Sequence, residues 1–369
     1  MNAQDLPMAM APMQPDKASA ANGKASRLIV QLVAPSGGGV RDYADCLKRE
    51  WLTMGIDSQL IALGQSDAAA RSLADRLDEL MRADGRPCSL VLHFSGYGFH
   101  PRGLCFWLTR EIEAARVKLG DRLRVVTMFH ELFASGPPWK SAFWVSRLQA
   151  RIAARIAKAS DALRTNTEPY RAWLATQVPS HVPIEVQAVF SNVGEPKTVR
   201  PQSERAKRLV VFGAAETRHR ALKPLRYFAQ ALSEQGVLEI VEVGPGPAFN
   251  WVHHKLPHRH LGRLGLTELG NILEQSAYGL IDYPEALLGK SSVMAAYAAH
   301  GCVVLNMRTV GERHSELHDR THFFNLLASP SIPSDASDRS PPTKAVVAWY
   351  RAHTLARHAP SLAELCFKV

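Results

Sequence analysis

The sequence predicts an α/β protein with two Rossmann-like, doubly wound domains that face a cleft, preceded by a disordered tail. Short apolar runs alternate with helical stretches on both sides of a polar segment that contains two prolines, as expected for parallel strands joined by helical crossovers. Several of the apolar runs end in a glycine-rich or polar turn, which is where open α/β sheets bind ligands. The 369 residues suffice for two domains with full cores.

The domain boundaries follow changes in composition along the chain. We expect a disordered tail over 1–26, an N-terminal domain over 27–195, a linker over 196–206 and a C-terminal domain over 207–329. Over 330–369 we expect a loop and C-terminal helices, for which packing back on the N-terminal domain is one arrangement. The tail has no periodicity, and it lacks the charged start and apolar run of a signal peptide.

Composition limits the class of protein and its partners. The five cysteines are scattered without metal-ligand spacing, which favours a reducing cytoplasm and no zinc. No apolar run is long enough to span a membrane, so we expect a cytoplasmic protein, with peripheral attachment at the inner membrane as an alternative. The formal charge of +10 calls for an anionic partner. Because no known nucleic-acid-binding module is present, we expect no nucleic acid.

The N-terminal domain is predicted from its alternating elements. We expect strands at 27–34, 57–63, 89–94, 122–128, 160–166 and 183–190, and helices at 40–54, 68–83, 104–119, 138–158 and 170–177. Gly37, Gly38 and Gly39 follow the first strand and allow close backbone approach to a ligand, although a plain tight turn is an equal alternative. His130 and Glu131 follow the fourth strand, at the ligand-binding edge of such a sheet.

The helix at 138–158 is basic and aromatic. Tryptophans lie near its start, and Arg147, Arg151 and Arg155 recur every fourth residue beside an apolar face. Such a helix could lie on an anionic membrane surface. The alternative is an ordinary domain helix with a solvated arginine row.

The C-terminal domain is predicted from a second alternation. We expect strands at 208–212, 238–243, 279–282 and 302–305, and helices at 221–234, 267–275, 290–300 and 343–358. Four histidines lie at positions 253, 254, 258 and 260. Since they lie in a predicted loop without carboxylates, we predict no metal site.

The segment 279–301 predicts an anion site. Lys290, Ser291 and Ser292 are expected in the first turn of a helix, where unpaired backbone N–H groups and a partial positive charge favour a phosphate. Pro284 stands where a Walker A loop needs its first glycine, which argues against a P-loop. A helix cap with a solvated lysine is the alternative.

Taken together, these motifs resemble the GT-B class of glycosyltransferases, and bacterial retaining enzymes of the family-four type in particular. The similar elements, which span almost the whole chain after the tail, are Ser36-Gly37-Gly38-Gly39-Val40 with Tyr43, Phe129-His130-Glu131-Leu132, Ser160-Asp161 with Thr165-Asn166, Phe212-Gly213 with Arg218, Arg220 and Lys223, and Lys290 through Gly301. The resemblance implies sugar transfer from a nucleotide-sugar donor to a glycan or lipid-linked acceptor. It implies no metal and no cofactor besides the donor, which is a co-substrate.

The resemblance also implies roles for individual residues. The catalytic candidates are His130, Glu131, Arg218 and Lys223, with Arg218 or Arg220 completing a basic pair with Lys223. Donor-binding candidates are Gly37, Gly38, Gly39, Arg220, Tyr283, Glu285, Lys290, Ser291 and Ser292. Val293 stands where the family's Glu-x7-Glu signature, begun by Glu285, has its second glutamate. The alternative function is therefore a noncatalytic relative that keeps the fold and binds a carbohydrate or a protein.

Overall fold

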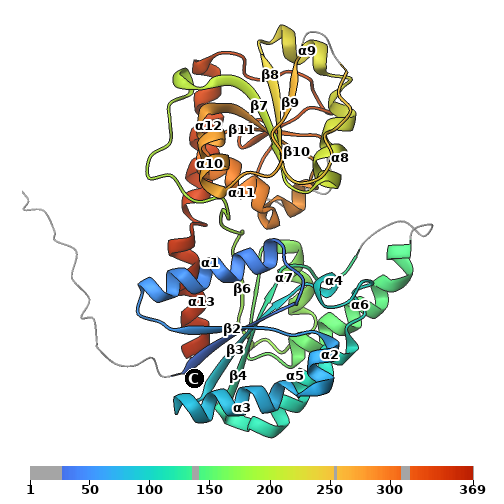
Figure 1. The fold of residues 1–369 in the computed structure, drawn as a ribbon, viewed down its shortest axis with the longest axis vertical. Coiled ribbons are helices and arrows are strands. Elements are labelled where there is room, and N and C mark those ends of the chain that lie inside the picture. Colours follow the sequence, from blue (N-terminus) through green and yellow to red (C-terminus); the bar gives the residue numbers. More distant parts are fainter. Residues whose placement is uncertain (1–26, 135–140, 253–255, 309–315, 369) are drawn as a thin grey trace, which may run out of the picture.

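The protein consists of two parallel, six-stranded sheets, each covered by helices (Figure 1). A computed structural model describes residues 27–134, 141–252, 256–308 and 316–368. The predicted tail at 1–26 lies outside the described residues. The predicted fold class, with two doubly wound domains that face each other, is confirmed.

The first strand of the N-terminal sheet lies second from one edge. In spatial order its strands are β2 (Ser58–Ala62), β1 (Leu28–Val33), β3 (Cys88–Phe94), β4 (Leu123–Phe129), β5 (Ala162–Thr165) and β6 (Ile184–Val186). The chain therefore moves outward from β1 to β2 and then returns to place β3 on the other side of β1. This reversal is a topological switch point, which opens a crevice at the carboxyl ends of the strands.

Helices flank this sheet on both faces (Figure 1). They are α1 (Gly39–Thr53), α2 (Gln65–Ala70), α3 (Leu73–Asp84), α4 (Gly96–Phe99), α5 (Phe106–Leu119), which the 3₁₀ turn η1 (Gly120–Arg122) extends, α6 (Ser141–Lys158) and α7 (Glu168–Ala175). The single helix predicted at 68–83 is wrong. Arg71 caps the end of the first helix, and Ser72 caps the start of the second, because its side chain accepts the N–H of Asp75.

The C-terminal sheet repeats the reversed order. Its strands are β12 (Phe323–Asn325), β11 (Val303–Asn306), β10 (Ser276–Ile281), β7 (Ala206–Phe212), β8 (Glu239–Val243) and β9 (His258–His260). The sequence did not predict β9 or β12, because three residues are too few for a periodic pattern. The switch point of this domain lies between β7 and β10.

Helices also flank the second sheet. They are α8 (Ala215–Leu225), α9 (Ala229–Glu234), α10 (Leu266–Gln275) and α11 (Ser292–His300), with the 3₁₀ turns η2 (Gln202–Glu204) and η3 (Glu285–Lys290). The helix predicted at 221–234 is wrong at its start and is interrupted after Leu225, next to Pro224 inside α8. The prediction that Lys290 lies in the first turn of the helix is wrong, because Lys290 is the last residue of η3 and α11 begins at Ser292.

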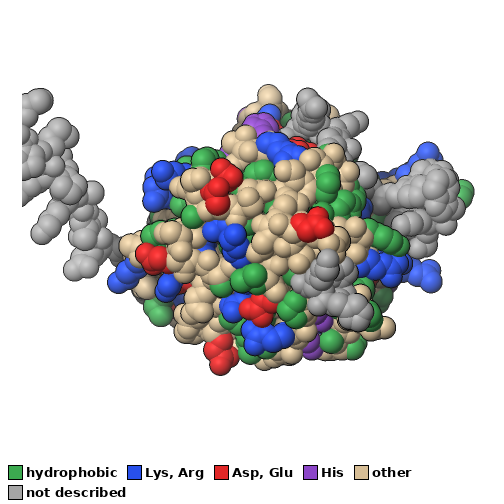
Figure 2. All heavy atoms as spheres, turned by 90° about the horizontal axis from the view of Figure 1, so that it is seen from above, with side chains coloured by type: hydrophobic (Ala, Val, Ile, Leu, Met, Phe, Trp, Pro, Cys, Tyr) green, Lys and Arg blue, Asp and Glu red, His purple; other side chains and the backbone are tan. Residues whose placement is uncertain are grey.

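The surface of the described residues mixes both signs of charge where Figure 2 views the outer end of the C-terminal domain. Lys and Arg side chains lie among Asp, Glu and apolar groups, without one broad basic field on this face. The net charge of +10 is therefore not gathered into a single patch here.

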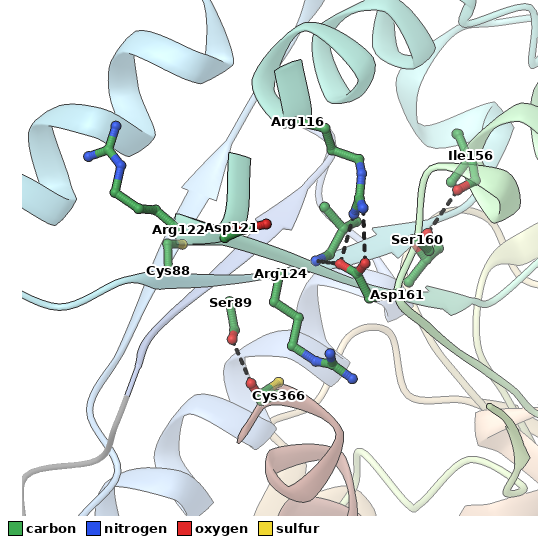
Figure 3. A network of polar contacts seen from close by, with 12 residues as sticks. Cys88, Ser89, Arg116, Asp121, Arg122, Arg124, Ile156, Ser160, Asp161 and Cys366 are labelled. Atoms are coloured by element: carbon green, nitrogen blue, oxygen red, sulfur yellow. Dashed lines mark hydrogen bonds and ion pairs between the residues drawn. The ribbon is translucent and has the colours of Figure 1, made fainter. Parts of the chain in front are cut away.

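The chain returns to the N-terminal domain at its end. The helix α12 (Ala336–Arg351) begins inside the predicted loop at 330–342 and includes Pro341 and Pro342. After it, α13 (Leu355–Phe367) packs against α1, β3 and β4. Figure 3 shows the contact: Ser89 Oγ donates to the carbonyl of Cys366 at 2.6 Å, and Arg116 holds Asp161 through two hydrogen bonds nearby. Buried apolar residues of α1, α11, α12 and α13 form one continuous core. The helix α13 thus completes the N-terminal domain.

Candidate functional site

A cavity of about 270 Å³ lies between the two domains, at the carboxyl ends of both sheets. The C-terminal domain contributes Tyr283, Lys290 and Ser292. The N-terminal domain contributes Gly39, Val40, Tyr43, Ser95, His130, Glu131, Asn166, Val189, Phe190 and Asn192. The segment after β10 and the ends of several N-terminal strands thus open onto one shared space.

Lys290 reaches across this cavity from the C-terminal domain. Its Nζ donates to Glu131 Oε1 and to the hydroxyl of Tyr170, both at 3.2 Å, and its side chain is 10% exposed. Burial alone would lower the pKa of Lys290, but the neighbouring Tyr283, Glu131 and Tyr170 raise it above its usual value. Lys290 is therefore a fixed cation at neutral pH, and the solvated-lysine alternative does not describe it.

The backbone before Lys290 is held by a close approach of the two domains. The N–H of Val189 donates to the carbonyl of Gly289 at 2.8 Å. A Cβ on Gly289 would lie 2.9 Å from the carbonyl oxygen of Asn166. Only glycine fits there without moving the backbone, so the position of Lys290 depends on this contact.

The start of α11 uses one of its two serines for its own cap. Ser291 Oγ accepts the N–H of Met294 at 3.2 Å, and Ser291 is buried. Ser292 instead lines the cavity. Within the described part of the chain the hydroxyl of Ser292 has no hydrogen bond, and it lines the same cavity as Lys290.

The glycine turn borders the same space. Gly37, Gly38 and Gly39 line an adjoining cavity of about 270 Å³ that includes His93, Ser95 and Tyr97. Gly38 has a φ of +128°, which disfavours other residues. A Cβ on Gly37 or Gly39 would meet no described atom within 4 Å. The turn therefore leaves room for a ligand rather than for protein packing.

The end of β4 places two predicted residues at the cavity. His130 is 8% exposed, and burial, followed by the nearby His93, Lys290 and His358, holds its pKa well below the usual value. Its imidazole is therefore neutral. Glu131 accepts from Ser95 Oγ at 3.0 Å through Oε2, while Oε1 accepts from Lys290.

Two carboxamide oxygens of the cavity wall have no hydrogen-bond partner among the described residues. They are Oδ1 of Asn166 and Oδ1 of Asn192, and both are buried atoms. Buried polar atoms are nearly always satisfied in proteins, so each oxygen is expected to gain a donor. Both residues line the cavity that holds Lys290, but the two oxygens themselves are closed off from solvent, so a ligand reaches them only if the carboxamides turn.

The structure places Arg218 differently from the prediction. Its guanidinium is fully buried and pairs with the equally buried Glu242 at 2.8 Å, and it also donates to the carbonyls of Gly213, Pro245 and Pro247. A Cβ on Gly244 would lie 2.4 Å from this guanidinium. Arg218 fixes the loops after β7 and β8 and is not available to a substrate.

Arg220, the second predicted basic residue, lies at the carboxyl end of β10 in the C-terminal sheet. Arg220 Nε donates to Asp282 Oδ2 at 2.7 Å, and Arg308 approaches the other oxygen of this carboxylate at 3.5 Å. Asp282 follows β10 and is 4% exposed, whereas both arginines are about half exposed. Lys223 is exposed one turn after Arg220. None of these side chains lines the 270 Å³ cavity.

The remaining predicted residues surround the turn after β10. Tyr283 lines the cavity, and its backbone is fixed by Asn306, which exchanges two hydrogen bonds with it. Glu285 is buried at the start of η3. Val293 is partly buried against the apolar core, so this position offers no carboxylate to a ligand.

Sequence reasoning missed four residues of the site. Ser95, Tyr170, Asn192 and Arg308 were not predicted to take part. Ser95 and Arg308 each follow a strand, which was a usable signal. Tyr170 and Asn192 come from a helix and a loop whose approach to Lys290 depends on the tertiary fold.

The described residues contain no group of three or more His, Cys, Asp or Glu that could hold a metal ion. Of the histidine-rich segment, His253 and His254 lie outside the described residues. His258 is a neighbour of Glu242, which accepts from it at 2.9 Å, and His260 lies within hydrogen-bond distance of the carbonyl of Gly244.

No profile of a known protein family matches the chain, and no curated protein sequence matches it. Solved structures do. An alpha-glucosyltransferase in complex with UDP superimposes with a TM-score of 0.56 at 10% identity, over 93% of this chain and 100% of that chain. The UDP-forming α,α-trehalose-phosphate synthase of Burkholderia xenovorans, in complex with glucose-6-phosphate, gives 0.58 at 12% identity, over 92% and 100%. HepE of Anabaena, in complex with UDP and glucose, gives 0.57 at 10%, over 92% and 98%.

These likenesses establish the GT-B architecture that the sequence resemblance implied. They cover nearly the full length of both partners, which includes both sheets and the cavity between them. At 10–12% identity they concern the fold alone, and the function is argued from the site.

Proposed function

We propose that this protein is a glycosyltransferase that moves a sugar from a nucleotide-sugar donor to a glycan or lipid-linked acceptor. The observation that carries the proposal is the cavity between the domains, where the buried ammonium of Lys290 lies opposite the neutral ring of His130. Asn166 and Asn192 line this cavity with carboxamide groups, which suit a ligand rich in hydroxyl groups, as a sugar is. The cation suits its leaving diphosphate.

The chemistry follows from these groups. The bond between the sugar C1 and the β-phosphate oxygen breaks, and its electron pair passes to that oxygen. The acceptor hydroxyl forms the new bond to C1 and gives its proton to the departing diphosphate. Lys290, the hydroxyl of Ser292 and the start of α11 stabilise the negative charge that develops, which is the largest single contribution in many enzymes. Arg220 and Lys223 hold the distal part of the donor, and no metal takes part.

The neighbours in fold suggest the first donor and the stereochemistry to test. The alpha-glucosyltransferase and HepE were solved with UDP, and the trehalose-phosphate synthase is UDP-forming. We therefore propose a UDP-sugar as donor. We also propose retention at the anomeric carbon, which the resemblance to retaining family-four enzymes supports.

A lipid-linked acceptor would lie at a membrane, and α6 is the helix predicted to contact a membrane surface. No helix of the described residues is long and apolar enough to cross a membrane. The apolar face in the second half of α6 packs inside the domain, since Ile152 and Ile156 are buried in the N-terminal core. Trp144 is 71% exposed, and Arg147 and Arg151 are exposed as well. We propose that this part of α6 meets anionic lipid at the inner face of a membrane.

The proposal is tested with the purified full chain and a panel of nucleotide sugars. Hydrolysis or transfer is followed by release of the nucleoside diphosphate, and binding by the thermal shift with UDP and other nucleoside diphosphates. We expect a stabilising shift and slow donor hydrolysis even without the acceptor. No shift, no hydrolysis and no transfer with any donor would overturn the proposal.

A noncatalytic relative is the second candidate, and Val293 is the observation that favours it. The side chain at this position packs toward the core, so the ribose carboxylate of the family is missing. Such a protein would bind carbohydrate or protein and be indifferent to the charge of Lys290. Replacing Lys290 by Met therefore separates the two, because an enzyme loses turnover while a binding module keeps its affinity.

A further inference from the structure

A chain of buried polar side chains leads from the cavity into the N-terminal sheet. His130 Nε2 lies 3.2 Å from His93 Nδ1, and His93 Nε2 lies 2.9 Å from Gln31 Oε1. Gln31 Nε2 donates to Ser58 Oγ at 3.4 Å. His93 and Gln31 are 0% exposed, and Ser58 is 2% exposed.

This chain runs across four neighbouring strands. Ser58, Gln31, His93 and His130 come from β2, β1, β3 and the end of β4, in the spatial order of the sheet. The ring of Tyr43 from α1 packs edge-on against both histidines, with centroids 5.7 Å and 4.9 Å away. The polar row is therefore enclosed by aromatic and apolar groups.

The fold does not need polar groups in this layer. The strands carry apolar residues at the neighbouring inward positions, such as Ile29 and Val91. A buried polar group costs free energy unless it is hydrogen-bonded, and a fully bonded row contributes little net stability compared with an apolar core. We therefore expect this row of polar side chains to have a function other than packing.

The hydrogen bonds determine which nitrogens carry protons. Burial lowers the pKa of His93 to about 3 and holds that of His130 well below its usual value, so each ring is neutral and has one N–H. The carbonyl oxygen of Gln31 only accepts, so the proton of His93 is on Nε2. His93 Nδ1 must then accept, and the proton of His130 is on Nε2. Nδ1 of His130 is left without a proton.

We propose that His93, oriented by Gln31, is a positioning residue that fixes His130 in its Nε2–H form, so that Nδ1 of His130 accepts a hydrogen bond from a hydroxyl of the donor sugar. The inference rests on the proposed function for the identity of the ligand, but the tautomer of His130 does not. A catalytic-site histidine is commonly oriented in this way by the partner of its second nitrogen.

The surroundings of His130 agree with a neutral acceptor. The charged or titratable groups that act on it are His93, Lys290 and His358. His358 Nε2 is 2.7 Å from the carbonyl of Ala188, and its Nδ1 is 2.9 Å from the hydroxyl of Tyr43. His358 is thus occupied elsewhere. Lys290 disfavours a second proton on His130, which keeps Nδ1 available.

Two substitutions of His93 separate positioning from packing. His93→Asn places a carbonyl oxygen near the position of Nδ1, so it can still accept from His130. His93→Phe fills the same volume but accepts nothing. We expect Phe to lower kcat by ~10–100-fold, in the range found for lost orienting partners. We expect Asn to restore kcat to within about threefold of wild type, with KM little changed in both.

The tautomer is measured directly in the full-length protein by nitrogen-15 NMR of labelled histidine, with the signals of His130 identified by their loss in His130→Gln. We expect the Nε2–H form in the wild type and in His93→Asn, and a mixture of forms in His93→Phe. The Nδ1–H form in the wild type, or an unchanged single form in His93→Phe, would overturn the proposal. Should His93→Phe not fold, Gln31→Leu removes the acceptor that orients His93 and is expected to give the same mixture.

The two proposals fail in different ways. A wild type with the Nε2–H form but no turnover of any nucleotide sugar would overturn the proposed function and leave the positioning of His130 intact. Turnover together with the Nδ1–H form would do the reverse.

Discussion

Replacing Lys290 by Met tests the central feature of the site with little change in volume. Met keeps the apolar stem of the lysine and removes the ammonium that lies 3.2 Å from Glu131 Oε1. At an effective dielectric constant of ~20, a charge pair at this distance has a Coulomb energy of about 5 kcal/mol before solvent competes. Because Glu131 is 43% exposed, water replaces much of the lost contact, and we expect a loss of only about 1 kcal/mol in the free energy of unfolding.

The expected effect on transfer is larger than the effect on stability. A cation that meets the leaving diphosphate interacts most strongly in the transition state, and its removal is expected to lower kcat on the order of a hundredfold or more, which is about 2.7 kcal/mol. The effect on kcat exceeds the effect on stability because the diphosphate develops its charge in a cavity where water screens little. The side chain of Lys290 is only 10% exposed there.

The assay compares kcat and KM for release of the nucleoside diphosphate in wild type, Lys290→Met and Lys344→Ala. Lys344 is exposed on α12 and does not line the cavity between the domains, so its variant controls for the loss of one positive charge. Thermal unfolding of each protein controls for folding. If Lys290→Met keeps kcat within about threefold of an active wild type, the assignment of Lys290 to the leaving group is wrong.

Three further predictions concern stability. Arg218→Gln leaves a buried carboxylate without its main partner, so we expect thermal unfolding to reflect a loss of about 3 kcal/mol, and a loss below about 1 kcal/mol would contradict the buried ion pair. Gly279→Ala would bring a Cβ to 2.4 Å from the buried ring of Tyr297, so we expect a loss of about 2–3 kcal/mol by the same measurement, and an unchanged stability would contradict this crowding. Burial lowers the pKa of both His93 and His358 to about 3, so below pH ~6.5 the unfolded chain binds more protons than the folded protein. Stability must fall as pH falls, by about 1.4 kcal/mol per pH unit for each histidine, and a melting temperature that is flat between pH ~7 and ~5 would refute this.

Much of the fold follows from the sequence because strand and helix periodicity is local. The regular runs at 89–94 and 122–128 become β3 and β4 within one residue at either end. The prediction of helix boundaries fails where residues that usually start or end a helix do not act in the usual way. Pro341 and Pro342 suggested a loop, yet they lie inside α12. Ser72 suggested nothing inside a helical pattern, yet it caps the start of α3, two residues after α2 ends at Ala70.

For the site, the sequence could predict only which residues lie after the strands. Lys290 and His130 follow strands, and the parallel topology brings such positions together. Spacing could not tell that Arg218 points into the domain while Arg220, two residues later, reaches the surface. Nor could it show that Tyr170 meets Lys290, because that contact depends on how the two domains approach each other.

The last helix has a consequence for how this protein is made. Because α13 supplies part of the wall of the N-terminal domain, with Ala359 accepting from the indole of Trp51 at 2.7 Å and Leu365 accepting from Arg124 at 2.8 Å, that domain stays incomplete until α13 has been synthesised. The apolar surface of the N-terminal domain that α13 covers is therefore exposed while the C-terminal domain is translated. A fragment cut at the linker would therefore be expected to aggregate, and early termination near residue 354 would damage the half of the protein that was made first.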